Sequence, residues 1–249
     1  MEARRERGRK PEGANERRTD CLEWQSGRQP WTSERGACRR RVRAEIPASP
    51  QFVKIALNVL FCVYMNIVQE IKNFVETECQ KPSSKYGYEP FIFHFTLVAE
   101  YAEKLADELG GDKEVILLAA WLHDIGSIIY GREDHQITGA KVAEDKLKEL
   151  NYSQEKIELV KLCILNHRGS KNNIRQSLEE QILAEADVLS NFSNISGIFK
   201  AALVYENKSQ GEARDSVKRK LTNKYNQLQF ESSRKLIKPK YEAAMILLA

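Results

Sequence analysis

Four side chains that bind metal ions well in proteins lie on or beside apolar stretches of this chain. His94 falls on the inward stripe of the helical pattern FHFTLVAEYAEKLADELGG. His123 and Asp124 end the most hydrophobic stretch, KEVILLAAWLHDIG, and Asp187 interrupts the apolar face of LEEQILAEADVLSNF. A buried aspartate costs free energy unless it is paired or binds a metal. Together the four residues predict a cation site between helices.

Each residue alone has an ordinary interpretation, since an inward histidine is more often a hydrogen-bonded core residue than a ligand. As a set, two histidines and two aspartates make a mixed nitrogen and oxygen shell. Such a shell suits Mn, Fe, Co, Ni or Zn better than Mg or Ca. Four ligands leave open positions on an octahedral metal, and a hydrolytic centre needs those positions for water and substrate.

The order of these residues resembles the H…HD…D signature of the HD-domain metal-dependent phosphohydrolases. The tetrapeptide HDIG at residues 123–126 matches the form that names a subgroup, and the likeness runs from about residue 90 to 192. The resemblance implies a helical bundle in which His94, His123, Asp124 and Asp187 hold one or two divalent metals. It further implies hydrolysis of phosphomonoester or phosphodiester bonds, often in nucleotides.

Two further histidines extend the likeness. His135 and His167 follow in an order similar to the expanded H…HD…H…H…D arrangement, which holds a second metal or orients phosphate. The ordinary alternatives are a polar loop for His135 and, for His167, a favourable position at a helix C-terminus. We expect one metal, with the second left open.

Arg168 and Lys171 could hold a substrate phosphate, Arg168 through its bidentate fork; solvated surface charge is the alternative. Some HD proteins carry a catalytic acid three positions after the HD pair, but here that residue is Ser127. No general base is therefore carried over from the family. Glu133 and Asp134 are acidic and near in sequence, but the sequence does not fix their direction.

The mechanism that follows is hydrolysis by a metal-activated water, with Asp124 or an outer group accepting the proton. The substrate class is a small phosphorylated molecule, nucleotides first, although no base-reading or sugar-reading motif is visible. Two alternatives stay open. One is a di-iron oxygenase of HD type, and the other is a helical module that binds a nucleotide or metal without turnover.

Helical periodicity continues from residue 66 to the C-terminus, without alternating strand patterns or Asn-Gly hairpin signals. We therefore predict an all-α protein. Residues 65–249 would form a single HD-type domain. Its C-terminal helices, 193–249, could cover the site or form a homodimer contact.

The first fifty residues have a different composition. Residues 1–50 contain 12 Arg and 1 Lys, whereas Lys outnumbers Arg 20 to 6 afterwards. This segment has no apolar period and is predicted to be disordered. We interpret residues 1–64 as an upstream extension, with Met65 as the natural start. The apolar segment 51–64 keeps an uncertain status.

The remaining totals exclude several classes of protein. The formal charge is +5 in residues 1–50 and −1 in the rest, so the body has no basic stripe for duplex nucleic acid. The five cysteines are scattered without a CxxC pair, which favours a reducing, cytoplasmic location. The apolar run 52–68 is short for a membrane span and contains Lys54, so insertion is not expected.

Overall fold

The structure is a computed structural model that describes residues 67–168 and 175–249. Both ranges belong to one compact unit of the chain, Ala48–Ala249. The predictions for the Arg-rich extension, the apolar segment and the start at Met65 lie outside the described residues. So does Lys171, whose proposed contact with phosphate stays a prediction.

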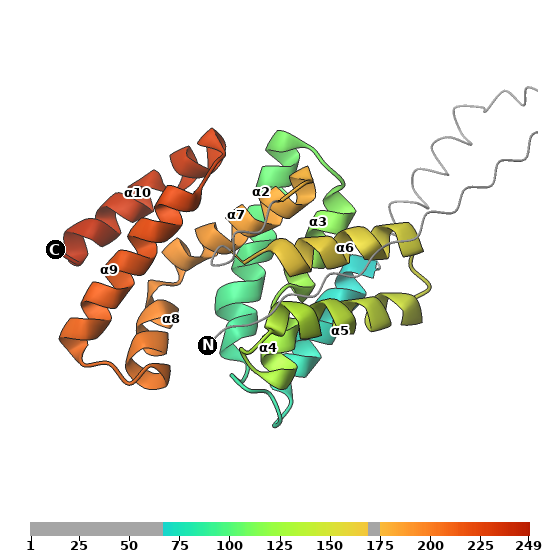
Figure 1. Cartoon of the computed structure of the whole chain (residues 1–249), viewed down its shortest axis with the longest axis horizontal. Coiled ribbons are helices and arrows are strands. Elements are labelled where there is room, and N and C mark those ends of the chain that lie inside the picture. Colours follow the sequence, from blue (N-terminus) through green and yellow to red (C-terminus); the bar gives the residue numbers. More distant parts are fainter. Residues whose placement is uncertain (1–66, 169–174) are drawn as a thin grey trace, which may run out of the picture. The chain divides into compact units, whose positions relative to one another are not determined.

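Every regular element in the two described ranges is a helix, which confirms the all-α prediction there (Figure 1). The first helix covers residues 67–80. The elements that follow are η1 (Phe91–Phe95), α2 (Thr96–Leu109), α3 (Lys113–Leu122), α4 (Ile125–Tyr130), α5 (His135–Glu149), α6 (Gln154–Asn166), α7 (Leu178–Ser193), α8 (Ile195–Lys200), η2 (Ala201–Tyr205), α9 (Gln210–Gln227) and α10 (Glu231–Leu247). The two η elements are π-helical turns.

Helix α3 lies at the centre of the packing. Its start is capped by Asp112, whose carboxylate accepts the backbone N–H groups of Glu114 and Val115. Every residue from Val115 to Leu122 is buried. The helix is surrounded by α2, α6 and α7, so the continuous apolar run has neighbours on all sides. The expectation of a central, shielded helix is confirmed.

The other helices pack around this centre in two groups. Helix α2 packs against α7 and η1, while α5 lies between α4 and α6. The C-terminal helices α9 and α10 run alongside each other and both contact α7 (Figure 1). Helix α8 and η2 also contact α9. The segment after residue 193 is thus attached to the helix that carries Asp187.

A short break in the chain separates α3 from α4 and holds the HDIG sequence. Helix α3 ends at Leu122, and α4 begins at Ile125 after a non-helical Asp124. Gly126 then faces α5 so closely that a Cβ atom would lie 2.3 Å from the carbonyl oxygen of His135. It would also lie 2.6 Å from the backbone nitrogen of Gly139. Only glycine permits this approach, which brings Asp124 beside the start of α5.

No single described helix is long and apolar enough to cross a membrane. The bent pair Lys113–Tyr130 and His135–Glu149 meets the requirement by length and composition alone.

The contact at Gly126 gives a first prediction. Gly126→Ala should lower the free energy of unfolding by about 2 kcal/mol or more, because the added methyl group meets backbone that cannot move aside cheaply. Gly211→Ala in α9 is the matched control. Nothing lies within 4 Å of its added methyl group, so we expect no loss of stability. Urea denaturation followed by circular dichroism measures both, and equal stabilities would contradict this packing role.

Candidate metal centre

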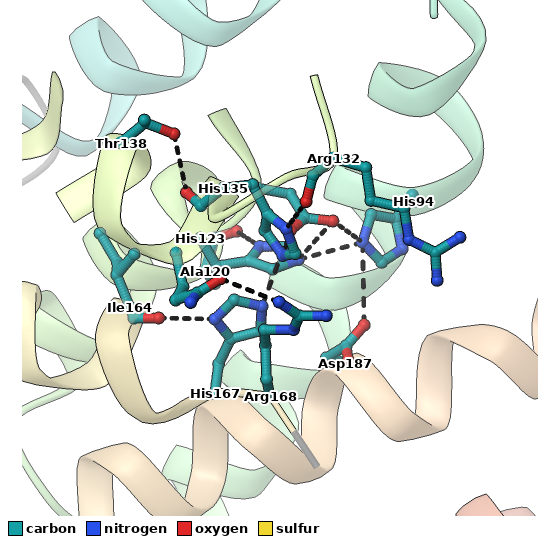
Figure 2. Close-up of polar contacts among 12 residues, drawn as sticks. His94, Ala120, His123, Arg132, His135, Thr138, Ile164, His167, Arg168 and Asp187 are labelled. Carbon is teal, nitrogen blue, oxygen red and sulfur yellow. Dashed lines mark hydrogen bonds and ion pairs between the residues drawn. The ribbon is translucent and has the colours of Figure 1, made fainter. Parts of the chain in front are cut away.

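His94, His123, Asp124 and Asp187 lie close together between η1, the α3–α4 break and α7. Figure 2 shows His94, His123 and Asp187 directed toward one another. The Nε2 atom of His94 lies 3.0 Å from Nε2 of His123 and 3.3 Å from Oδ2 of Asp124. It lies 3.7 Å from Oδ1 of Asp187. Two ligands at right angles on a metal, each about 2.1 Å from it, are about 3.0 Å apart. The observed spacing fits shared coordination.

Three of the histidines have their tautomer fixed in the same way. In His123, His135 and His167, Nδ1 lies within hydrogen-bond distance of the backbone carbonyl three residues earlier. The acceptors are the oxygens of Ala120, Arg132 and Ile164, at 2.8, 2.8 and 2.6 Å. A carbonyl can only accept, so Nδ1 carries the proton. Each neutral ring therefore presents an Nε2 lone pair, as metal-binding histidines do.

His94 reaches the same state through Ser190 of α7. The Ser190 hydroxyl donates its proton to the carbonyl oxygen of Asp187 at 2.8 Å, so its oxygen is left to accept. Nδ1 of His94 lies 3.3 Å from that oxygen, so a proton on Nδ1 would find an acceptor there. The Nε2 lone pair of His94 then faces the Nε2 lone pair of His123. Two lone pairs at 3.0 Å repel unless a cation lies between them.

Asp124 occupies the middle of the cluster. Its Oδ2 faces His94 and lies 3.7 Å from Nε2 of His123. Its Oδ1 lies 3.1 Å from Nε2 of His135 and 3.6 Å from Nε2 of His167. Oδ1 is buried and has no hydrogen-bond partner among the described residues. A buried carboxylate oxygen surrounded by imidazole lone pairs needs a cation.

Two overlapping ligand groups follow from this arrangement, and they share Asp124. One group contains His94 and His123, and the other contains His135 and His167. Within each group the ligand atoms lie within 4.8 Å of one another. The donor set of the first group therefore fits a divalent transition metal, and the second group offers further donors that could hold an ion.

The pKa values of the cluster residues depend on two opposing effects, burial and the charges of neighbouring side chains. Burial lowers the pKa of His123 to about 4, which keeps this ring neutral near pH 7. Burial acts to raise the pKa of Asp124, but the neighbouring histidines outweigh it and hold that pKa well below its usual range. For His94 and His135, burial acts to lower the pKa, and the adjacent Asp124 carboxylate, which would pair with a protonated ring, outweighs it and raises the pKa. A proton can thus occupy positions that the geometry offers to a metal.

The cluster opens into a cavity of about 1060 Å³. Its lining includes Arg168, whose Nη1 donates to the amide oxygen of the buried Gln136 at 3.0 Å. A neutral amide orients the guanidinium without neutralising its charge. Ser127 also lines the cavity, whereas Glu133 and Asp134 are exposed and lie outside it. The two acids are therefore poorly placed to serve as a base.

All four histidines and both aspartates that the sequence singles out meet in this cluster, and Arg168 lies on its rim. His135 is buried and faces Asp124, so the polar-loop alternative for it is wrong. The Nδ1 of His167 does satisfy its own helix end, while Nε2 faces the cluster.

Three residues of the site were not predicted from the sequence: Ser190, Gln136 and Lys224. Lys224 of α9 lies 3.9 Å from Oδ2 of Asp187. Lys220 and Lys224 are four apart on one helix face, but such lysine pairs are common on solvated helices. The sequence therefore offered no signal that could separate them from surface charge.

The sequence profile of the HD domain family matches residues 91–191, which contain the whole cluster. Residues 91–191 are therefore similar to the HD domain family. A protein of Clostridium beijerinckii is 35% identical over 101 residues, which cover 39% of this chain and 62% of the relative. A second curated relative is matched over 39% of its length. The chain thus spans less than two thirds of these relatives.

Solved structures with the same fold include an HD-superfamily hydrolase of Bacillus thuringiensis, with a TM-score of 0.59 and 18% identity. The match covers 74% of this chain and 94% of that one. Another is YpgQ of Bacillus subtilis in complex with ADP, with a TM-score of 0.59 and 16% identity. That match covers 74% of this chain and 92% of YpgQ. At these identities the likeness establishes the fold of the HD domain and of the helices that follow it.

The central position of Asp124 gives the second prediction. Asp124→Asn should weaken binding of a divalent metal by at least about tenfold, because even outer-shell partners of a metal site contribute that much. Asp145→Asn, which removes an exposed carboxylate paired with Lys141, is the control. Metal content after dialysis and calorimetric titration with Mn²⁺ measure the effect. An Asp124→Asn protein with the metal content of the wild type would contradict the assignment.

Proposed function

We propose that this protein is a metal-dependent hydrolase whose substrates are phosphomonoesters or phosphodiesters of small molecules, nucleotides first. The proposal rests on the cluster around Asp124, in which a buried carboxylate oxygen has no hydrogen-bond partner among the described residues. This cluster opens into a cavity that is lined in part by cationic side chains. The HD-domain match and the hydrolase named among the structural neighbours support the coarser conclusion, a metal-dependent hydrolase.

His94, His123, Asp124 and Asp187 would hold the metal. A divalent ion there supplies Lewis acidity and lowers the pKa of a bound water. Mn, Fe, Co, Ni and Zn are the ions that this nitrogen and oxygen donor set suits. His135 and His167 face the other oxygen of Asp124, so they would hold a second ion or orient a phosphate oxygen.

The other residues of the site act on the substrate. Arg168 is oriented by Gln136 and would stabilise negative charge on phosphoryl oxygens through its fork. Asp124 belongs to both ligand groups, so the reaction would depend on its carboxylate. Ser127 cannot act as a carboxylate base, so the proton passes to Asp124 or to solvent in the open cavity.

The cavity and one neighbour support the nucleotide class. Small-molecule sites commonly enclose about 300–1,000 Å³, so this cavity is large enough for a nucleotide. YpgQ, which shares the fold, was solved with ADP bound. The cavity is also lined by aromatic and amide side chains that suit the uncharged base of a nucleotide: Tyr86, Phe93, Tyr205, Asn191, Asn194 and Asn223.

A second function, a di-iron oxygenase, is favoured by one observation. The two ligand groups share Asp124, so together their nitrogen and oxygen donors would be able to hold two iron ions. Iron analysis with electron paramagnetic resonance separates the two functions, because a mixed-valent signal with oxygen consumption belongs to the oxygenase alone.

The third prediction concerns activity. The purified protein should hydrolyse members of a panel of nucleotides and phosphate esters when loaded with Mn, Co or Ni, and Asp124→Asn should lower kcat/KM by at least about a hundredfold. Phosphate release measures the reaction, and Asp145→Asn is again the control. A wild-type protein that binds metal and nucleotide without releasing phosphate would instead be a binding module.

The fourth prediction separates the role of Arg168 from that of the metal. Arg168→Lys should raise KM about tenfold or more and leave the metal content unchanged, because lysine keeps the charge and loses the bidentate fork. Arg214→Lys, an exposed position on α9, is the control. Steady-state kinetics on the best substrate of the panel gives KM. An unchanged KM would place Arg168 in the ordinary solvated surface.

A further inference from the structure

Lys224 of α9 lies beside Asp187, although it is outside the segment that matches the HD domain family. We propose that Lys224 of α9 binds an anionic oxygen of the substrate, on the α9 side of the cavity. The lysine lines the cavity, and its side chain is 28% exposed. The inference rests on the proposed function, because it assumes a substrate with a phosphate group.

The charges around the cavity distinguish Lys224 from its neighbours. Lys200 is bound to Glu89 at 2.5 Å, and Lys220 is bound to Glu206 at 2.6 Å. These two lysines are held by carboxylates that have no part in the metal cluster. The carboxylate that Lys224 approaches is Asp187, one of the proposed metal ligands.

The contact between Lys224 and Asp187 is an ion pair at long distance and not a hydrogen bond. Nζ lies 3.9 Å from Oδ2, which is longer than a hydrogen bond, and both side chains are partly exposed. Once Asp187 shares its charge with a metal, the attraction falls further. A lysine that is left with unbalanced charge beside a metal centre can bind the phosphate that the metal also contacts.

The position of Lys224 is fixed from α7. The buried carboxylate of Glu185 accepts the backbone N–H groups of Gln229 and Phe230 at 2.6 and 3.1 Å, and so ties the end of α9 to the helix that carries Asp187. The rings of Tyr225 and Tyr241 stack 4.1 Å apart and join α9 to α10. The lysine is therefore held at the cluster by the fold and not by its ion pair.

The experiment measures binding of inorganic phosphate by calorimetry to the full chain loaded with Mn²⁺. Lys224→Met should weaken phosphate binding on the order of tenfold or more and keep the wild-type metal content. Lys224→Arg, which keeps the charge, should bind phosphate within a few fold of the wild type. Lys218→Met is the matched control, because Lys218 is exposed on the same helix and lies outside the cavity.

The outcomes separate this inference from the proposed function. If Lys224→Met binds phosphate as the wild type does, the inference is overturned, whether or not the protein is a hydrolase. If Lys224→Met loses its metal, Lys224 serves Asp187 and not the substrate, and the inference is again overturned. If the wild type hydrolyses no phosphoester and Lys224→Met still weakens phosphate binding with its metal retained, the inference stands and hydrolysis alone fails.

Discussion

The structure depends on one constraint, the burial of one carboxylate oxygen of Asp124, Oδ1, in a cluster of imidazole rings. Its two oxygens face four histidines, and Oδ1 has no hydrogen-bond partner in the described part of the chain. Such a group is costly in a protein interior unless a cation is present. The backbone carbonyls that fix the tautomers of three of these histidines make that demand specific. The chain is arranged so that only positive charge completes its centre.

Local irregularities of the helices place these side chains. His94 lies in a π-helical turn, an element that often occurs at functional sites, and Asp124 lies in the break between α3 and α4. Gly126 lets α4 approach α5 at a distance that any Cβ would prevent. The cluster of His and Asp side chains thus forms where regular helix geometry is interrupted. The regular helices around α3 supply the rigid surroundings.

The segment beyond the HD-domain match completes the cavity. Glu185 and Asp187 lie two residues apart on α7, so the helix that offers a metal ligand also anchors the turn between α9 and α10. One face of the cavity therefore comes from residues that carry no family signature. The lining of the cavity is therefore set by two parts of the chain, the segment that matches the HD domain family and the helices that follow it.

The sequence by itself determined the helical class, the central position of α3 and the His and Asp residues that form the cluster. It could do so because burial of apolar side chains imposes a periodicity, and because histidine and aspartate on an apolar face need a partner. Only the tertiary structure decided that His135 joins the cluster, that Glu133 and Asp134 do not, and that Lys224 meets Asp187. Helix packing makes these contacts: His135 lies 11 positions after Asp124, and Lys224 lies 37 positions after Asp187. No local pattern encodes which solvated lysine will face a distant aspartate. The residues of the cluster could be predicted from the types of their side chains. The lining of the cavity could not, because it depends on how distant helices pack together.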